Sequence, residues 1–353
     1  MDTNNSKSAP GDLLRIIDAN INRIGEGLRV LEDIARMHFN DTVLSSQLKD
    51  MRHSLQDIPY SIKLKTLNHR DAAGDVGAFL ETSTHHTEMG LYNFIVANSK
   101  RVQQATRVVE EIAKTESIGI DSDKYKKARF ELYTLERDML SKFMRQGKQS
   151  RIKGLCVVID SKACQVHAPV QLAQTIIDSG AQIIMLNRRK MTDRYALELA
   201  FNLSDACAKS NTLFIVDSRA DIAGSSSADG LLLGNNDLSI TAARNCLPFE
   251  AVIGIEVFKP RQAAEAASAG ADFISSGPLL DTDKDNEGAK IDVDTLKAIR
   301  SSTHLPLVAF GGINRDNIDL VISSGADSVA IASSVTCASN PADSMRELSD
   351  YFR

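Results

Sequence analysis

Hydrophobic residues recur at two different spacings in the two parts of the chain. In the N-terminal part they recur every three to four positions, which is the spacing of one buried face of an α-helix. Helices are therefore expected over residues 13–37, 41–58, 89–115 and 122–146. After residue 153 the pattern changes to short apolar runs separated by segments of helix length, which is typical of alternating strands and helices. The pattern predicts a helical domain followed by an α/β domain.

An internal repeat lies within the helical part. The segment ANINRIGEGLRVLEDIAR (19–36) aligns without gaps on ANSKRVQQATRVVEEIAK (97–114), with identity at eight of eighteen positions. The repeat predicts a bundle built of two related helical hairpins. Arg23 and Arg101 occupy equivalent positions in it. Charges in the repeat are expected to form ion pairs that fix the register of the bundle, and the alternative for these two arginines is an anion-binding role.

Eight apolar runs follow one another at even intervals in the C-terminal part. They cover residues 154–160, 181–187, 212–218, 229–234, 251–257, 271–277, 306–312 and 328–334. A small residue, Ala and usually Asp precede every second run, where a helix ends and the chain turns into a strand. Eight evenly spaced βα units favour a closed (β/α)8 TIM barrel over an open doubly wound sheet.

These patterns divide the chain into four segments. They are a disordered tail at 1–10, a helical bundle of two related hairpins at 11–146, a linker at 147–153 and a compact (β/α)8 barrel at 154–353. The linker prediction rests on the polar, glycine-bearing stretch QGKQSRIKG (146–154). The expected fold class is thus α/β, with an all-α domain preceding the barrel.

Composition narrows the classes of function. The chain has 353 residues, of which 43% are hydrophobic, and a net charge of −5, so no strongly basic field attracts nucleic acid or an anionic membrane. No stretch approaches the ~20 apolar residues that span a bilayer. The five cysteines show no C-x-x-C spacing, as is typical of reduced intracellular thiols. We therefore expect a cytoplasmic protein that acts on small molecules, and homo-oligomerisation stays open.

Two strand ends near the C-terminus predict a phosphate-binding cradle. LVAFGGIN (307–314) places Gly311 and Gly312 after the seventh apolar run, and SVAIASS (328–334) places Ser333 and Ser334 after the eighth. Glycines leave backbone N–H groups uncovered, and the serines add hydroxyl groups beside them. In (β/α)8 barrels a phosphate is often bound at this place, and the alternative is a tight turn that only needs small residues.

Charged side chains follow the second to fifth apolar runs. They are Arg188, Arg189 and Lys190, then Asp217 and Arg219, then Asp237, and finally Glu256. Arginine and lysine neutralise phosphate oxygens, whereas Asp217 and Asp237 offer the hard oxygen ligands that Mg²⁺ prefers. Together they suit a diphosphate bridged to Mg²⁺. The alternative is a solvated basic loop, with carboxylates that cap the following helices.

A longer polar loop follows the sixth run. Residues 277–292 read GPLLDTDKDNEGAKID and include Thr282 and Lys284. Loops of this length over a barrel mouth often close on substrate. Lys284 could reach a phosphate in the Gly–Ser cradle, or it could be a solvated charge.

Several motifs together resemble one family of enzymes. LFIVDSRADIA (213–223), ADGLLLGNNDLS (228–239), SSGPLLDTDKD (275–285), LVAFGGIN (307–314) and GADSVAIASSV (325–335) resemble thiamine-phosphate synthase. The helical repeat and HRDAAGDVG (69–77) resemble the N-terminal extension of some bacterial members. The resemblance covers the whole chain.

The resemblance implies a specific reaction. Members of this family are transferases that join hydroxymethylpyrimidine diphosphate to hydroxyethylthiazole phosphate, which yields thiamine phosphate and diphosphate with Mg²⁺ as cofactor. It implies catalytic roles for Arg188, Arg189, Lys190 and Lys284. It implies substrate contacts for Asp217, Arg219, Glu256, Thr282, Gly311, Gly312, Ser333 and Ser334. It implies metal positions at Asp217, Ser218 and Asp237.

Departures from the family pattern occur on the diphosphate side. A family metal-binding Asp is replaced by Ser218, with Asp217 beside it, and Glu256 adds a negative charge. At the second strand two registers stay open. Either Met185, Asn187 and Arg189 or, one residue along, Leu186, Arg188 and Lys190 face the mouth, and these are exclusive because side chains alternate along a strand. The alternative function is therefore a catalytically impaired family member that binds or senses a phosphorylated ligand.

Overall fold

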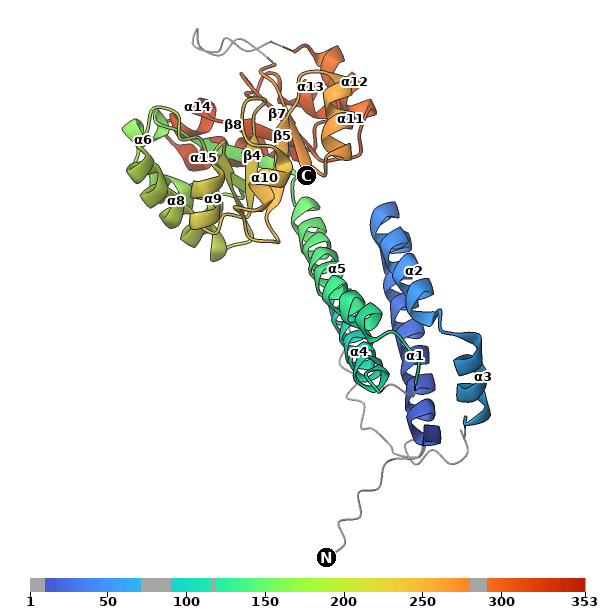
Figure 1. Ribbon diagram of the computed structural model, residues 1–353. Helices are drawn as coiled ribbons and strands as arrows, with labels where there is room; N and C mark the ends of the chain where they lie inside the picture. Colours follow the sequence, from blue (N-terminus) through green and yellow to red (C-terminus); the bar gives the residue numbers. More distant parts are fainter. Residues whose placement is uncertain (1–9, 71–89, 116–117, 280–290, 353) are drawn as a thin grey trace, which may run out of the picture. The chain divides into compact units, whose positions relative to one another are not determined.

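The chain folds into two compact units. The computed structural model describes residues 10–70, 90–115, 118–279 and 291–352. Unit 1 comprises Met1–Phe143 and unit 2 comprises Met144–Arg353; among the described residues, unit 1 is helical and the strands lie in unit 2 (Figure 1). Of the tail predicted at 1–10, residues 1–9 lie outside the described part, and Pro10 is already the first residue of a helix.

Unit 1 is built from helices that largely follow the predicted ones. They are α1 (Pro10–Asp33), the π-helical turn η1 (Ile34–His38), α2 (Thr42–Gln56), α3 (Tyr60–Asn68), α4 (Leu91–Ala113) and α5 (Ser122–Gln149). Leucine and isoleucine side chains of α1, α2, α4 and α5 form one buried cluster. Helix α3 was not predicted, because it buries only Ile62 and Thr66 and so lacks an apolar stripe.

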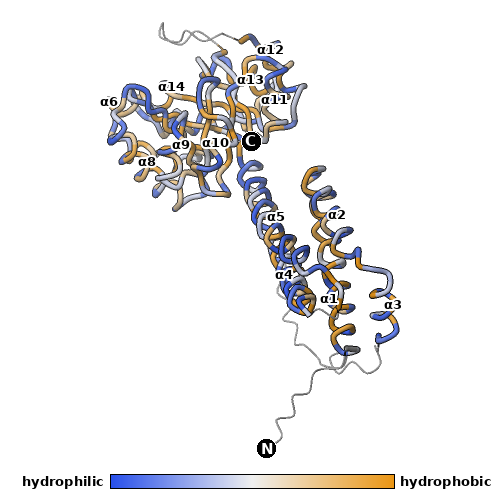
Figure 2. The backbone as a smooth tube through the Cα atoms, viewed as in Figure 1, coloured by the Kyte–Doolittle hydropathy of each residue, from blue (hydrophilic) through white to orange (hydrophobic). Residues whose placement is uncertain are grey.

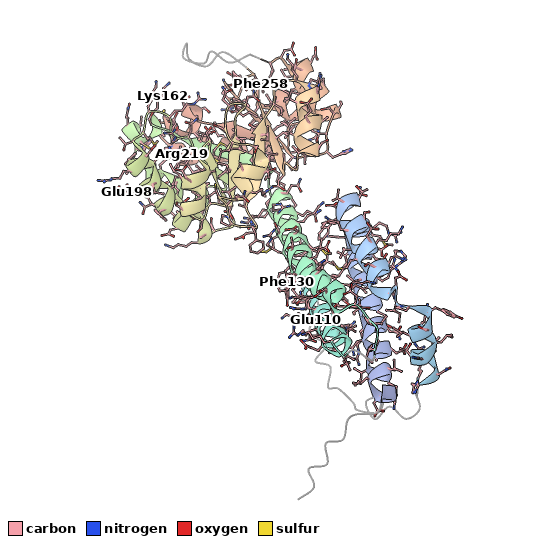
Figure 3. All side chains as sticks on the ribbon, viewed as in Figure 1. Glu110, Phe130, Lys162, Glu198, Arg219 and Phe258 are labelled. Carbon is pink, nitrogen blue, oxygen red and sulfur yellow. The ribbon has the colours of Figure 1, made fainter. Side chains whose placement is uncertain are left out.

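The two repeated segments pack against each other as α1 on α4. Each carries one buried glutamate, which is Glu32 on α1 and Glu110 on α4; Figure 3 labels Glu110. Arg52 of α2 lies 2.9 Å from the Glu32 carboxylate, and Arg129 of α5 lies 3.0 Å from that of Glu110. Removing one partner would leave a buried charge uncompensated. The α1–α2 and α4–α5 hairpins are therefore each stabilised by an equivalent Glu–Arg ion pair.

Unit 2 is a closed barrel of parallel strands, which confirms the predicted fold. The strands are β1 (Gly154–Ile159), β2 (Ile183–Leu186), β3 (Leu213–Asp217), β4 (Gly230–Leu233), β5 (Val252–Glu256), β6 (Phe273–Ser276), β7 (Leu307–Phe310) and β8 (Ser328–Ile331). Each pairs with the next in chain order, and β8 closes the ring on β1. Every strand lies within one of the eight apolar runs of the sequence.

Helices surround this ring (Figure 1). They are α6 (Ala163–Val166), α7 (Pro169–Asp178), α8 (Asp193–Ala208), α9 (Ala220–Ser225), α10 (Ile240–Arg244), α11 (Pro260–Ser268), α12 (Val293–Ser301), α13 (Ile318–Ser323), α14 (Ser333–Thr336), α15 (Pro341–Ser349) and the 3₁₀ turn η3 (Asp350–Phe352). No helix in the described ranges combines the length and apolar character that a membrane span requires.

Side chains of each strand alternate between the barrel interior and the helix layer. Met185 and Leu232 belong to the interior cluster, whereas Leu186 and Leu231 belong to the cluster between strands and helices. Both faces are therefore largely apolar, and hydrophobic segments run through unit 2 between its helices (Figure 2). This alternation decides which residues after each strand face the barrel mouth.

An Asp precedes three of the even-numbered strands and stabilises the end of the barrel at which the strands begin. Asp229, Asp272 and Asp327 each accept a hydrogen bond from the first N–H groups of the neighbouring odd strand, at Phe214, Ile253 and Leu307, over 2.8–3.0 Å. Gln182 does the same for Leu155 at 2.7 Å. Each carboxylate also pairs with a basic side chain, such as Lys148, Arg145 or Arg300. The repeated side chain before each even-numbered strand thus provides a hydrogen-bond acceptor for an N–H group near the start of the neighbouring strand.

The linker predicted at 147–153 is wrong in its first three residues, because α5 continues through Gln149. Lys148 Nζ lies 2.9 Å from the carboxylate of Asp229, and Gln149 Nε2 donates to the carbonyl oxygen of Asp272 at 2.7 Å. These contacts within unit 2 stabilise the last helical turn, although Gly147 lowers the local helix propensity.

Asp272 is expected to be essential for barrel stability. Its side chain accepts from Ile253 N and pairs with both Arg145 and Arg244, so Asp272→Ala removes the carboxylate partner of two arginines and the acceptor of one backbone N–H. We expect a loss of about 2–4 kcal/mol in the free energy of unfolding, measured by denaturant titration. The control Asp294→Ala, at a side chain that is 92% exposed, should change it by less than about 0.5 kcal/mol. Equal effects would contradict this role.

Candidate active site

The two strand ends that were predicted to form a phosphate cradle lie side by side, after β7 and β8. These strands are hydrogen-bonded neighbours, with Phe310 opposite Ala330. Gly311 and Gly312 follow β7 with φ of 97° and 65°, a backbone conformation that favours glycine. Ser334 Oγ lies 3.5 Å from the carbonyl oxygen of Ile313, so the two segments touch. The cradle is open to solvent, because Ser333 and Ser334 are exposed and the glycines are half-buried.

Three carboxylates stand at the ends of β3, β4 and β5. Asp217 and Glu256 are the last residues of their strands, on the interior-facing side of the alternation. Asp237 Oδ2 accepts a hydrogen bond from Gly234 N at 2.7 Å. A methyl group at Gly234 would lie 3.3 Å from Asp237 Oδ2 and 3.6 Å from Glu256 Oε2, so both carboxylates flank this glycine. The mouth therefore concentrates negative charge.

Burial shifts the titration of two of these carboxylates, Glu256 and Asp217. Desolvation raises the pKa of Glu256 to about 7, with Asp217 and Asp237 adding to the rise and Arg189 opposing it. Desolvation also raises the pKa of Asp217, which the hydroxyl of Ser218 and the charge of Arg189 partly offset. Ser218 Oγ donates to Asp217 Oδ1 at 2.9 Å, and its φ of 64° turns the chain sharply after the strand. The charges of Asp217 and Glu256 are thus not fully compensated.

The end of β2 brings one arginine to this group. Met185 faces the interior, so alternation places Asn187 at the mouth, and Asn187 Oδ1 accepts from Arg189 N at 3.0 Å. Of the two registers that the sequence leaves open, the structure therefore has the one with Met185, Asn187 and Arg189. The positive charge of Arg189 acts on both Asp217 and Glu256.

Two other predicted arginines turn to a neighbouring ion-pair network. Asp193 Oδ1, at the start of α8, accepts from Arg188 at 3.1 Å and from Arg219 at 2.7 Å. Arg219 (labelled in Figure 3) also forms two hydrogen bonds to Asp221, at 2.7 and 2.6 Å. Arg188 still lowers the pKa of Asp217, as the last of the causes that act on it. The structure thus separates these arginines from Arg189.

The remaining predicted residues lie at the rim or outside the described ranges. Lys190 is exposed, with a φ of 67°, and lies at the turn after β2. Thr282 and Lys284 fall within 280–290 and so lie outside the described part of the chain.

The carboxylates do not form a complete metal cage. Within residues 10–70, 90–115, 118–279 and 291–352, no three His, Cys, Asp or Glu side chains are arranged to hold a metal ion. Mg²⁺, however, is usually held by one or two carboxylates together with phosphate oxygens of the substrate. Asp217 and Asp237, with hard oxygen atoms and a surplus of negative charge, fit that second arrangement.

Comparison with known proteins identifies the family of this chain. A family model described as thiamine monophosphate synthase matches residues 155–335, which is more than half of the chain. The chain belongs to the thiamine monophosphate synthase family. A second model, described as the ThiD2 family, matches residues 15–138 in the helical unit.

Relatives of this family match nearly the whole chain. The thiamine-phosphate synthase of Synechococcus sp. (strain WH7803) is 31% identical over 341 residues, covering 96% of both chains. That of Rhodopirellula baltica is 32% identical, covering 90% of this chain and 87% of the relative. Among solved structures, thiamine phosphate pyrophosphorylase from Pyrococcus furiosus is 29% identical with a TM-score of 0.53, covering 58% of this chain and 96% of that chain. The family and the barrel fold predicted from the sequence are thus confirmed.

Asp193 was missed by the sequence reasoning as a site residue. It follows Thr192, whose hydroxyl caps α8 by accepting from Tyr195 N, and so resembles an ordinary first-turn acid. The sequence signal that could have identified Asp193 is its position shortly after three consecutive basic residues. Only the adjacency of β2 and β3 shows that one carboxylate joins Arg188 and Arg219.

Glu256 is expected to make stability fall as pH rises. Because its pKa is about 7 in the folded chain and about 4.5 when unfolded, folding takes up a proton between these values, so its contribution is lost as pH increases from 4.5 through 7. Glu256→Gln should therefore raise the free energy of unfolding at pH 8 by about 1–3 kcal/mol and leave it nearly unchanged at pH 4.5. The measurement is denaturant unfolding at both pH values.

The exposed Glu198 on α8 provides the control for this prediction. Glu198→Gln should give the same small change at both pH values. A gain for Glu256→Gln that does not depend on pH would contradict the assignment of a desolvated carboxylate.

Proposed function

We propose that this protein is a thiamine-phosphate synthase, a transferase that joins hydroxymethylpyrimidine diphosphate to hydroxyethylthiazole phosphate. The observation that carries the proposal is the meeting, at one barrel rim, of a Gly–Ser phosphate cradle with an arginine and paired carboxylates. The near full-length similarity to synthases supports the enzyme over the non-catalytic alternative.

The mouth divides into two halves that match the two substrates. Gly311, Gly312, Ser333 and Ser334 are proposed to bind the thiazole phosphate through backbone N–H groups and hydroxyls. The first N–H groups of α14, at Ser333 and Ser334, have no acceptor within their own helix and add to this cradle. Arg189, with Arg188 and Lys190 at its side, is proposed to hold the diphosphate on the opposite half.

The reaction needs little proton transfer from the protein. The carbon–oxygen bond to the diphosphate breaks with its electron pair leaving on oxygen, and the thiazole nitrogen then supplies the pair for the new carbon–nitrogen bond. Charge therefore accumulates on the leaving diphosphate. Arg189 is suited to stabilise this charge, because among the described residues no carboxylate forms an ion pair with its guanidinium. The cradle holds the nucleophile in position.

Asp217 and Asp237 are the residues proposed to hold Mg²⁺. The ion, when bound, would neutralise diphosphate oxygens, and it would also relieve the repulsion among the three carboxylates of the mouth. Asp217 stands in for the aspartate expected at Ser218, since its side chain has the interior-facing parity of β3. Glu256 is proposed to line the substrate-binding side of this Mg²⁺ site.

The substrates and the thiols agree with a cytoplasmic location, which we include in the proposal. Both substrates are phosphorylated small molecules, and all five cysteines are free thiols. Cys156 and Cys207 lie buried, and burial raises the pKa of both to about 12. They are therefore unreactive core residues.

Diphosphate release tests the proposed function directly. The purified full-length protein, given both substrates and Mg²⁺, should release diphosphate and form thiamine phosphate. Asp237→Asn keeps the acceptor for Gly234 N but removes the charge, so kcat/KM should fall roughly 10- to 100-fold. Asp319→Asn, at an exposed position of α13, should leave the rate unchanged. Binding without turnover in the wild-type protein would overturn the proposal.

The phosphate cradle has its own matched pair of variants. Ser333→Asp places a negative charge where the thiazole phosphate is proposed to bind, whereas Ser333→Asn adds similar volume without charge. We expect Ser333→Asp to raise the KM for the thiazole phosphate about tenfold or more and to leave the KM for the pyrimidine diphosphate nearly unchanged. Ser333→Asn should have a much smaller effect. Equal effects of both variants would argue against a phosphate at this position.

A further inference from the structure

Two strained turns flank the half of the mouth where the diphosphate is proposed to bind. The turn after β2 is closed by Met191 N, which donates to the carbonyl oxygen of Arg188 at 2.9 Å, and it contains Lys190 with a φ of 67°. The turn after β3 contains Ser218 with a φ of 64°. Both residues adopt the left-handed conformation, which is unfavourable for residues other than glycine. Such a conformation persists only where surrounding contacts hold the backbone in place.

These two turns carry the arginine and the carboxylate of the proposed site. Arg189 lies within the turn after β2, and Asp217 directly precedes Ser218 in the chain. Because β2 and β3 are hydrogen-bonded neighbours, with Leu186 opposite Val216, the two turns leave adjacent strands side by side. The charge of Arg189 opposes the desolvation that raises the pKa of Asp217, so the two side chains lie within range of each other. The conformation of either turn therefore affects the distance between them.

One carboxylate joins the two turns. Asp193 Oδ1, at the start of α8, accepts from Arg188 Nη1 at 3.1 Å and from Arg219 Nη1 at 2.7 Å. Arg188 belongs to the turn after β2, whereas Arg219 directly follows Ser218 and is the N-cap residue of α9. Alternation along β2 places Arg188 on the same side as Leu186, which faces the helix layer. The Asp193 carboxylate thus connects the two turns on the side away from the mouth.

The guanidinium of Arg219 has a fixed orientation in this connection. Its Nε and Nη2 donate to the two carboxylate oxygens of Asp221 at 2.7 and 2.6 Å, which fixes the plane of the group. These hydrogen bonds lower the pKa of Asp221 to about 2, so the pair stays charged near neutral pH. The Asp193 side chain is 67% exposed, and ion pairs at exposed positions add little to global stability. We therefore expect its effect on the geometry of the turns.

We propose that Asp193 is a positioning residue, which holds the turns after β2 and β3 together and so sets Arg189 and Asp217 in place for the leaving diphosphate. The inference rests on the function proposed above and adds to it a residue that acts through others. Left-handed residues in both turns require contacts that offset their strain, and the shared carboxylate gives one contact to each turn. Without Asp193 both turns relax, and Arg189 is displaced from the leaving group.

The sign of the effect distinguishes positioning from simple electrostatics. Asp193→Ala removes a negative charge beside a site for an anion, so electrostatics alone would lower the KM for the pyrimidine diphosphate. Positioning has the opposite result: kcat/KM for this substrate should fall about 10- to 100-fold, and the KM for the thiazole phosphate, proposed to bind at β7 and β8, should change by less than about twofold. Asp193→Asn keeps one acceptor oxygen for the arginines and should cause a smaller loss.

Asp221 provides the matched control. Asp221→Ala removes a carboxylate from the same guanidinium, but the connection from Arg188 through Asp193 to Arg219 stays in place. This variant should not lower kcat/KM for the pyrimidine diphosphate. Thermal unfolding verifies that the variants are folded. Equal losses in Asp193→Ala and Asp221→Ala, or a gain in Asp193→Ala, would overturn the proposal.

Hydrogen–deuterium exchange without substrates tests the same role apart from the proposed function. The N–H groups of Arg189 and Met191 donate hydrogen bonds within the turn after β2, which protects them from exchange. We expect a loss of protection over residues 187–192 in Asp193→Ala and none in Asp221→Ala. Unchanged protection in Asp193→Ala overturns the positioning role even if the enzyme is active. Absence of diphosphate release by the wild-type protein contradicts the proposed function alone, and the exchange measurement still decides whether Asp193 holds the turns.

Discussion

Closure of the strand ring is the constraint on which the proposed site depends. Because β8 pairs with β1, all eight parallel strands end at one rim, and residues far apart in sequence meet there. The cradle at Gly311 and Ser333 and the carboxylates at Asp217 and Glu256 share this rim only for that reason. The opposite rim carries the complementary device, in which buried carboxylates such as Asp272 bind the first N–H groups of neighbouring strands. One end of the barrel thus carries contacts that stabilise the strands, and the other carries the proposed site.

The mouth uses buried charge in a way that a purely structural end would avoid. At the opposite rim, each of Asp229, Asp272 and Asp327 has both an N–H donor and a basic partner, so its charge is compensated. At the mouth, Asp217 and Glu256 have raised pKa values because their desolvation exceeds the help they receive from Arg189. Such uncompensated groups are typical of sites that await a charged ligand. The same chain therefore places the same residue type in two opposite electrostatic settings.

The helical unit applies one design twice. The buried pairs Glu32–Arg52 and Glu110–Arg129 hold each hairpin, and the packing of α1 on α4 relates the two hairpins to each other. Arg23 and Arg101 each contact a buried asparagine of their own repeat. The duplication thus reproduces the same contacts in both hairpins.

Sequence periodicity determined α1, α2, α4, α5 and the eight strands, because burial imposes local patterns that repeat every 3.6 or two residues. The small residues after the last two apolar runs predicted that Gly311 and Ser333 lie together. Periodicity did not find α3, which buries too few side chains to leave a stripe, or the helical turn at 147–149, which tertiary contacts stabilise. Only the tertiary structure decided that Asn187 and Arg189 face the mouth while Asp193 binds Arg188 and Arg219. Strand register and contacts between neighbouring strands are set by packing across the ring, and packing leaves no local trace in the chain.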